Sequence, residues 1–323
     1  MTRAIVLKEY GGPEQLTLET IAVGEPGPGE VRVRHTAIGV NFIDTYFRRG
    51  LYPIKLPAII GDQAVGIIEA VGPEVADFKP GDRIAYGSHG PSYVEARVMP
   101  ARHIVHLPVG LGEDVVAASL TRGMTAEYLL FRLHALTANE TVVVHAAAGG
   151  TGLIVCQWAR HLGATVIATV GAESKVEVAR AAGAHHVLVH SRPDFVARVR
   201  ELTAGRGVDV VYDSIGRDTF QHSLECLRPR GLMVAYGNAS GKPDPLDVLA
   251  LARHGSLFLT RPNLGHYVST RAEFELASGR YFDALHSGIV KPHAAQRFAL
   301  ADAPAAHRHL EDREQLTIPI LVP

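Results

Sequence analysis

A glycine-rich run, AAAGGTG at residues 146–152, lies between an apolar segment and a stretch with helical spacing. The apolar segment ends at His145, and apolar residues recur at helical intervals from Val155 to Leu162. A helix that starts here directs free backbone N–H groups and a partial positive charge toward the run, which suits a pyrophosphate. We therefore expect a dinucleotide to contact Ala148, Gly149, Gly150, Thr151 and Gly152.

The same run lacks the first glycine of the pattern G-x-G-x-x-G, because Ala147 stands in its place. The string alone therefore also fits a flexible turn without a ligand. What favours the cofactor site is the order of strand, turn and helix, followed by five further strand–helix elements.

A second candidate phosphate site follows the next predicted strand, in the residues TVGAESK (169–175). Gly171 leaves room for a 2′-phosphate, Ser174 offers a hydrogen bond and Lys175 offers a positive charge. Arg192, after the third strand, adds a second charge. A basic residue at this point of a dinucleotide fold favours NADPH over NADH.

Two features of this segment support other interpretations. Ser174 and Glu177 match the S-x-x-E pattern of a capping box, in which Lys175 would only be a solvated residue. The carboxylate of Glu173 would repel a 2′-phosphate and thus favours NADH.

These residues require a scaffold, and the chain from about residue 121 onward supplies an alternation of strands and helices. The expected strands are 142–146, 165–170, 185–190, 208–214, 231–237 and 256–260; the helices between them run through Trp158, Arg180, Leu202 and Leu227, with a fifth near Leu249. Six parallel strands with crossover helices predict an α/β, doubly wound dinucleotide-binding domain.

Residues before about 120 instead form short β segments separated by glycine and proline, which predicts a small, partly closed β-barrel. The expected strands are 30–40, 64–72, 82–87, 93–99 and 104–108. A long helix over 271–286 and a final strand over 318–322 are expected to return to this first domain.

Composition limits the class of protein. A chain of 323 residues predicts two domains, and two cysteines cannot build a four-thiolate zinc site. A net charge of −1 without long charged runs argues against nucleic acid as a partner. The apolar segments are too short for a membrane span or a secretory signal, so we expect a cytoplasmic protein. Of 17 histidines, pairs such as His185-His186 and His307-x-His309 are interpreted as surface or packing residues.

Several longer motifs resemble a known family. They are NFIDTYFRRGLYP (41–53), HAAAGGTGL (145–153), YDSIGRDTF (212–220), RGLMVAYGNASG (230–241) and FLTRP (258–262). In order and length they resemble the bacterial quinone oxidoreductases, the zinc-free branch of the medium-chain dehydrogenase/reductase superfamily that includes ζ-crystallin. The resemblance runs from GGPE at 11–14 to the C-terminus.

The resemblance implies a GroES-like domain over 1–121, a Rossmann domain over 122–261 and a return of 262–323 to the first domain. It also implies NADPH in the cleft between the domains, and a homodimer. Zinc-dependent relatives carry a cysteine and a Gly-His-Glu where Asn41 and Gly61-Asp62-Gln63 stand here. An amide cannot replace a thiolate ligand, so no metal is expected.

By the same resemblance, a pocket for the nicotinamide and the substrate contains Asn41, Asp44, Tyr46, Tyr52 and Thr125. Hydroxyl and amide donors there would steady the quinone oxygen that gains negative charge. From the residues alone, the two tyrosines are equally well rim aromatics of a barrel, and Asp44 a cap of its local turn.

The resemblance assigns cofactor contacts to Gly149, Gly152, Ser174, Lys175, Ser214, Asn238, Arg261 and Arg313, in addition to the turn residues above. Two departures affect the adenosine side: His190 replaces the family's tyrosine, and Glu173 replaces a neutral residue.

The expected reaction is hydride transfer from NADPH to a quinone, without zinc. Two alternatives stay open, namely reduction of an enone or enoyl thioester, and a binding protein that holds NADPH or RNA without efficient turnover.

Overall fold

The computed structural model describes residues 1–192 and 194–323. The chain divides into two compact units. Unit 1 comprises Met1–Met124, Val268–His286 and Pro292–Pro323, and unit 2 comprises Thr125–Tyr267 and Ser287–Lys291.

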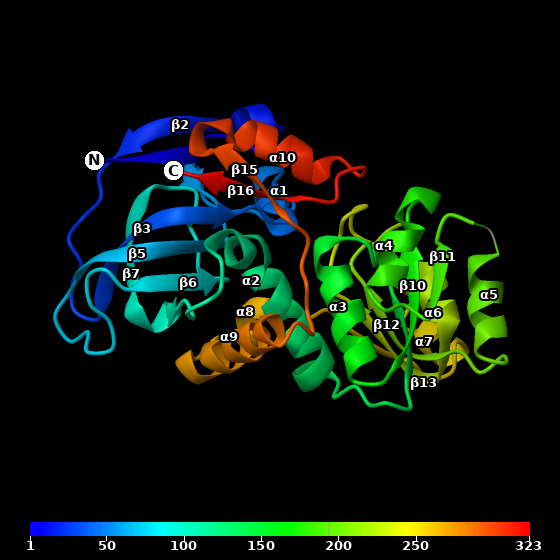
Figure 1. The fold of residues 1–323 in the computed structure, drawn as a ribbon. Helices are drawn as coiled ribbons and strands as arrows, with labels where there is room; N and C mark the ends of the chain where they lie inside the picture. Colours follow the sequence, from blue (N-terminus) through cyan, green and yellow to red (C-terminus); the bar gives the residue numbers. More distant parts are fainter. Residues whose placement is uncertain (193) are drawn as a thin grey trace. The chain divides into compact units, whose positions relative to one another are not determined.

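Unit 2 is built on a six-stranded parallel sheet in the order β11-β10-β9-β12-β13-β14, numbered by position along the chain (Figure 1). The strands are β9 (Thr141–Val144), β10 (Thr165–Val170), β11 (His186–Val189), β12 (Val208–Asp213), β13 (Leu227–Ala235) and β14 (Phe258–Thr260). Counted within the unit, the order is 3-2-1-4-5-6, which is that of a doubly wound dinucleotide fold. The predicted fold class is confirmed.

Helices connect these strands and cover the sheet (Figure 1). They are α3 (Gly150–His161), α4 (Val176–Ala181), α5 (Phe195–Leu202), α6 (Phe220–Cys226) and α7 (Leu249–Arg253), with the shorter α8 (Leu264–Tyr267), the 3₁₀ turn η4 (Glu173–Lys175) and the π-helical turn η3 (Tyr128–Leu133). All six residues of β12 are buried, because helices on both faces of the sheet exclude water from its centre.

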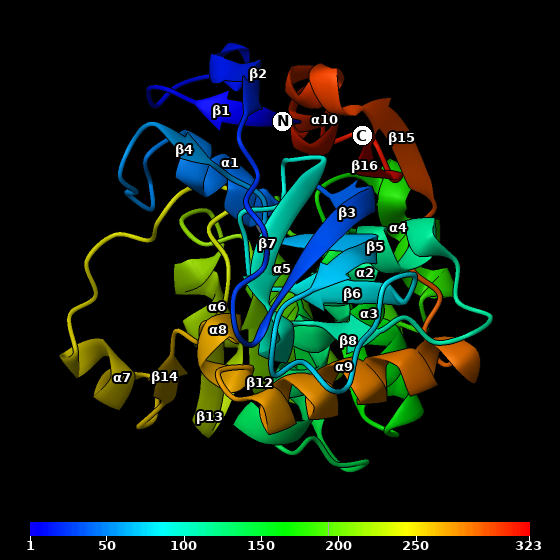
Figure 2. The ribbon, with the colours of Figure 1, turned by 90° about the vertical axis from the view of Figure 1, so that its left-hand side faces the viewer.

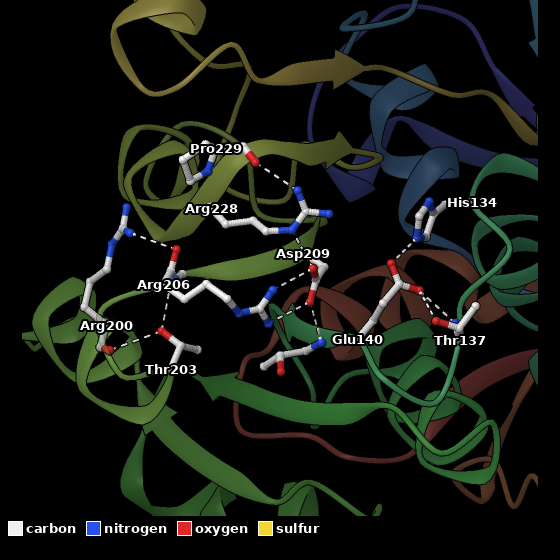
Figure 3. A network of polar contacts seen from close by, with 11 residues as sticks. His134, Thr137, Glu140, Arg200, Thr203, Arg206, Asp209, Arg228 and Pro229 are labelled. Atoms are coloured by element: carbon white, nitrogen blue, oxygen red, sulfur yellow. Dashed lines mark hydrogen bonds and ion pairs between the residues drawn. The ribbon is translucent and has the colours of Figure 1, made fainter.

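A polar cluster joins the first residues of the two central strands (Figure 3). Asp209 on β12 accepts hydrogen bonds from Arg206 at 2.9 Å, from Arg228 at 2.6 Å and from the backbone N–H of Thr141 at 2.8 Å. Burial by itself would raise the pKa of Asp209, but these hydrogen bonds outweigh it and hold the pKa at about 2. The ionised carboxylate thus fixes the register of β9 against β12.

Unit 1 contains a three-stranded sheet, β2-β1-β4, and a seven-stranded sheet in which β15-β16-β3-β5-β6-β8 follow one another and β7 also pairs with β3 (Figure 2). The strands are β1 (Thr2–Leu7), β2 (Leu16–Ile21), β3 (Glu30–Gly39), β4 (Ala58–Ile59), β5 (Gln63–Val71), β6 (Arg83–Gly87), β7 (Ala96–Pro100), β8 (Val105–His106), β15 (Ala295–Ala299) and β16 (Ile318–Val322). Strand β16 lies between β15 and β3, so the end of the chain sits inside this sheet.

Unit 1 contains two helices from the N-terminal part of the chain and two from the C-terminal part. They are α1 (Phe42–Arg48), α9 (Arg271–His286), α10 (Ala303–Glu311) and most of α2 (Glu113–Glu127), with 3₁₀ turns η1 (Pro13–Gln15), η2 (Ala101–His103) and η5 (Leu300–Asp302). The helix predicted over 271–286 and the strand predicted over 318–322 are confirmed.

The structure differs from the expected elements of unit 1 in several places. Strands β1 and β2, which pair with each other along their whole length, were not expected, nor were β4 and β15. The strand expected over 93–99 starts only at Ala96, because the residues before it contact β1 instead: the N–H of Ile5 donates to the carbonyl of Tyr93 at 2.8 Å, and Ala4 and Val94 form an isolated β-bridge.

Among the described residues, no helix is both long enough and apolar enough to cross a membrane.

Candidate functional site

The glycine-rich turn lies between β9 and α3, as expected from the sequence. Gly149 is the N-cap of α3, and Gly150, Thr151 and Gly152 form its first turn, so their backbone N–H groups have no intrahelical acceptor. A Cβ atom on Gly152 would lie 2.3 Å from the carbonyl oxygen of Ala146, so only glycine fits there. Ala148, within the turn, is buried. The turn presents backbone donors in the manner of a phosphate-binding site.

Four of the expected adenosine-side residues gather where β10 and β11 end. His190 lies beside Gly171: a Cβ atom on that glycine would be 3.8 Å from His190 Nε2, an ordinary contact. Glu173 and Arg192 form an ion pair across the two strand ends. The carboxylate that would oppose a 2′-phosphate therefore already has a counter-charge.

Ser174 and Lys175 lie in the 3₁₀ turn η4, immediately before α4. The N-cap of α4 is Lys175, and no side-chain hydrogen bond caps this helix. Glu177 is ion-paired with Arg180 instead. The alternative interpretation of Ser174 and Glu177 as a capping box is therefore wrong, and Ser174 is an exposed residue of η4.

Ser214 and Asn238 follow the next two strands and lie close together. The backbone N–H of Ala239 donates to the carbonyl oxygen of Ser214 at 3.2 Å, and a Cβ atom on Gly237 would lie 2.4 Å from the same oxygen. Arg261 follows β14 and is exposed, with Nη1 donating to the carbonyl of Pro262 at 2.9 Å. Thus the expected residues of unit 2 follow the carboxyl ends of all six strands, where open α/β sheets bind ligands.

Arg313 is the one expected cofactor residue outside unit 2. It follows α10 in unit 1 and is exposed. Thr125 begins unit 2 on helix α2 and is half-buried.

The other expected pocket residues lie on or just after α1 in unit 1. Asn41 is the N-cap of this helix and Asp44 is its third residue, and together they form a capping box. Asp44 Oδ2 accepts a hydrogen bond from the backbone N–H of Asn41 at 2.8 Å. The capping role considered for Asp44 is therefore confirmed.

Both side chains of the capping box are buried, at 5% exposure for Asn41 and 0% for Asp44. Within the described part of the chain, neither Asn41 Nδ2 nor Asp44 Oδ1 has a hydrogen-bond partner. Burial and the negative charge of Asp62 raise the pKa of Asp44 to about 8. Two unpaired buried polar atoms on one helical turn require an explanation, and a bound ligand is one.

Tyr46 and Tyr52 meet at the other end of the same helix. Their rings lie 5.4 Å apart in an edge-to-face arrangement, and the backbone N–H of Tyr52 donates to the carbonyl of Tyr46 at 3.3 Å. Both residues are half-buried. They form an aromatic pair, which combines flat apolar surface with hydroxyl groups.

The positions at which zinc-dependent relatives carry Gly-His-Glu have a structural role here. Gln63 is fully buried and bridges β5 to α2, with Nε2 donating to the carbonyl of Ala117 and Oε1 accepting from the N–H of Thr121. Asp62 Oδ2 accepts from Thr121 Oγ1 at 3.2 Å. Among the residues that the structure describes, no group of three or more Cys, His, Asp or Glu side chains is placed to hold a metal.

Sequence reasoning missed two sets of polar residues near these sites. Asp213 is buried and accepts hydrogen bonds from the N–H groups of Ile215 and Gly216, which shapes the loop that carries Ser214. Its place in the motif YDSIGRDTF was a usable signal. Tyr93 bonds to Asp44 and to His307, which is 214 residues away in the sequence, and this pair had no such signal.

Comparison with known proteins places the chain among dehydrogenases and reductases. A family model described as alcohol dehydrogenase GroES-like domain matches residues 27–141, and one described as zinc-binding dehydrogenase matches residues 150–277. The predicted GroES-like character of the N-terminal part is thus confirmed.

Individual relatives match over the whole chain. A 2-haloacrylate reductase from a Burkholderia species is 46% identical, covering 100% of this chain and 99% of its own. A quinone oxidoreductase from Pseudomonas aeruginosa is 44% identical, covering 100% of both chains. The crystal structure of Escherichia coli quinone oxidoreductase complexed with NADPH has a TM-score of 0.96 and 42% identity, covering 99% of this chain and 100% of its own.

Proposed function

Since the chain belongs to the quinone oxidoreductases of the medium-chain dehydrogenase/reductase superfamily, we propose that it is an NADPH:quinone oxidoreductase. Full-length relatives of this name are 42–44% identical to it, and one of them is known in complex with NADPH. The observation within this chain that carries the proposal is the phosphate-binding turn at Gly152, with Lys175 and Arg192 following the adjacent strands.

The residues of unit 2 fit a dinucleotide. Gly152 brings the start of α3 against Ala146, which leaves the turn open to a pyrophosphate, and Gly171 leaves the end of β10 without a side chain. Ser174, Lys175 and Arg192 are the residues that would bind a 2′-phosphate. When bound, NADPH supplies a hydride from its nicotinamide ring, which carries two electrons and one hydrogen to the acceptor.

The residues of unit 1 are proposed to bind the quinone. The Tyr46–Tyr52 pair offers an edge of aromatic surface to a flat ring, and the Asn41 amide offers a hydrogen-bond donor. Such donors stabilise the negative charge that develops on a quinone oxygen as it is reduced. The second hydrogen of the hydroquinone is a proton from solvent.

A second candidate activity is reduction of a conjugated carbon–carbon double bond. The 2-haloacrylate reductase at 46% identity supports this candidate, which uses the same cofactor and a different acceptor. The alternative substrates then include small unsaturated acids in addition to enones and enoyl thioesters.

We further propose a cytoplasmic homodimer that needs no zinc, with residues 122–261 as the dinucleotide-binding region and residues 1–121 and 262–323 as the other domain. Support for the dimer comes from β14, which is the edge strand of its sheet and exposes Phe258. The near-neutral charge does not support a nucleic-acid partner.

The experiment that tests the proposal is a titration of the purified protein with NADPH and NADH, followed by turnover assays at saturating cofactor. The acceptors are a panel of benzo- and naphthoquinones, a 2-haloacrylate and an enoyl thioester, each followed by loss of NADPH absorbance. We expect tighter binding of NADPH and the highest kcat/KM with a quinone. Higher kcat/KM for the haloacrylate would replace the proposed substrate class.

A further inference from the structure

A chain of four buried side chains links helix α1 to helix α10, which lie side by side in unit 1 (Figure 1). Asp44 Oδ2 is 3.0 Å from the hydroxyl of Tyr93, which is 2.9 Å from His307 Nε2. His307 Nδ1 is 2.9 Å from Arg48 Nη1. All four side chains are buried at 0% exposure.

The hydrogen bonds in this chain can run in one direction only. Arg48 has no acceptor atom, so its guanidinium must donate to His307 Nδ1. A neutral His307 then carries its proton on Nε2 and donates it to the oxygen of Tyr93. The hydroxyl of Tyr93 is left to donate to Asp44.

Two features keep the hydrogen bonds in this direction: His307 is neutral, and the guanidinium of Arg48 is fixed in place. Burial, together with the charges of Arg48 and Arg49, lowers the pKa of His307 to about 3, so the imidazole is neutral. Arg48 donates three hydrogen bonds to Glu311, two from Nη2 at 2.9 and 3.2 Å and one from Nη1 at 3.2 Å, and its Nε donates to the carbonyl of Gly11 at 3.2 Å.

Asp44 Oδ2 therefore accepts two hydrogen bonds, from Tyr93 and from the backbone of Asn41, while Oδ1 accepts none within the described residues. In the protonated acid the hydrogen belongs on Oδ1, because Oδ2 already faces two donors. The nearby charges are the carboxylate of Asp62, which favours the protonated acid, and the guanidinium of Arg122 on α2, which opposes it.

We propose that Tyr93 and His307 are positioning residues of the reductase site: they occupy Oδ2 of Asp44, which burial keeps as a neutral acid, so that its Oδ1–H joins the Asn41 amide in donating hydrogen bonds to the acceptor oxygen that gains negative charge. The first turn of α1 then presents two donors and no negative charge. This inference rests on the proposed function, because it takes the α1 turn as the place where the acceptor binds. No bond is made or broken at Asp44, which acts as a hydrogen-bond donor only.

A defined dependence on pH follows. The pKa of Asp44 is about 8, so the donor is present at neutral pH and is replaced by a carboxylate as the pH rises. Above that pH the turn carries a negative charge that opposes reduction of the acceptor. The kcat of quinone reduction should therefore fall on the alkaline side.

Two variants test the link from Tyr93 to Asp44. In Tyr93→Phe the carboxylate loses a donor that stabilises its ionised form, so the alkaline midpoint should rise by about 1 pH unit. In Asp44→Asn the amide keeps a donor but cannot ionise, so activity should be lower at neutral pH and should no longer fall as the pH rises.

His307 is tested by a pair of substitutions. Glutamine reproduces the acceptor and the donor of the neutral imidazole, whereas leucine reproduces neither. We expect His307→Gln to keep the midpoint close to that of the wild type, and His307→Leu to shift it upward as Tyr93→Phe does. A merely structural role for the imidazole predicts lower stability in both variants and no shift of the midpoint.

Tyr86 provides the matched control. It is also a fully buried tyrosine bonded to a buried histidine, with its hydroxyl 2.8 Å from His35 Nε2. The opposite nitrogen of His35 donates to the carbonyl of Val94, so Tyr86 donates to the imidazole and its chain ends there. Tyr86→Phe should leave the alkaline midpoint of quinone reduction unchanged.

An infrared titration of the intact protein gives a readout that does not need turnover. The carbonyl stretch of a protonated carboxyl that disappears in Asp44→Asn should titrate near the kinetic midpoint, and the midpoint should rise in Tyr93→Phe. A wild-type protein without quinone turnover would overturn the proposed function whatever this band does. Quinone turnover combined with an unshifted band and an unshifted pH profile in Tyr93→Phe would overturn the present inference alone.

Discussion

Arg192 and Glu173, which follow the neighbouring strands β11 and β10, are ion-paired at the site proposed for the 2′-phosphate of the cofactor. Both side chains are largely exposed, at 61% and 65%, so the pair contributes little to stability. Its effect is on selectivity, since a 2′-phosphate has to compete with the Glu173 carboxylate for the same guanidinium.

We expect Glu173→Gln to tighten the binding of NADPH by about 2- to 5-fold, because removal of one exposed charge pair is worth up to about 1 kcal/mol. Binding of NADH, which has no 2′-phosphate, should change little. Fluorescence titration with both nucleotides measures the effect. Glu177→Gln is the control, because Glu177 is paired with Arg180 in the next turn. An equal change for NADPH and NADH would contradict the assigned competition.

Lys175→Glu should weaken NADPH by at least about 10-fold and NADH far less, because it exchanges attraction for repulsion at the 2′-phosphate. The measurement is the ratio of the two dissociation constants. Arg198→Glu, an exposed charge reversal on α5 of the same unit, should leave that ratio unchanged. Loss of affinity for both nucleotides to the same degree would refute contact between Lys175 and the 2′-phosphate.

Gly152→Ala should lower the free energy of unfolding by about 1–3 kcal/mol, because its Cβ would overlap a backbone oxygen that cannot move away. It should also abolish binding of both NADPH and NADH. Gly279→Ala is the control: Gly279 lies within α9 with open space around it, so alanine there should stabilise the protein by about 1 kcal/mol. Urea unfolding compares the two, and full cofactor binding by Gly152→Ala would remove the turn from the site.

Stability should fall as the pH drops below about 6.5, because His35 is buried and neutral in the fold. Burial lowers the pKa of His35 to about 4, so below pH 6.5 the unfolded chain takes up a proton that the folded chain does not. Between pH 7 and 5 the wild type should lose roughly 2 kcal/mol more than His35→Gln. His186→Gln, an exposed position, should lose as much as the wild type. Parallel losses in wild type and His35→Gln would contradict this origin.

Phe258→Asp should convert the proposed homodimer into a monomer, because it places a charge on the edge strand β14. Phe258 is 62% exposed, and the next residue of the strand, Leu259, is 37% exposed. Light scattering coupled to size-exclusion chromatography measures the mass. Leu276→Asp, at an exposed apolar position on α9, should remain dimeric. A dimer that persists in Phe258→Asp would exclude β14 as the contact.

Local patterns predicted the fold of unit 2 closely. Strand β10 has the predicted bounds, and helix α5 ends at the predicted Leu202, since parallel strands and crossover helices differ clearly in hydrophobic period. Strand β1 was missed because it is buried at five of six positions and lacks the alternation of a half-buried strand. Its place in the sheet depends on pairing with β2 and β4, which the fold brings to its two sides.

The site was predictable where neighbours in sequence are neighbours in space. The capping box of Asn41 and Asp44 is local, so a cap at Asp44 could be considered from the sequence, although its partner Asn41 was not identified. The contact between Tyr93 and His307 forms only when α10 packs on α1, and no local pattern encodes it. His307 was accordingly interpreted as a surface or packing residue, whereas it is buried and bonded on both ring nitrogens.

The placement of β16 inside its sheet has a consequence for how the protein is made. Strand β3 pairs with β5 on one side and, through Gly39 and Ile38, with β16 on the other, so these two residues have no partner on this second side in a nascent chain until Ile318–Val322 has left the ribosome. All strands of unit 2 are translated before that point. Unit 2 can therefore fold during translation, whereas the sheet that supports Asn41 and Asp44 is completed only after β16 has been made.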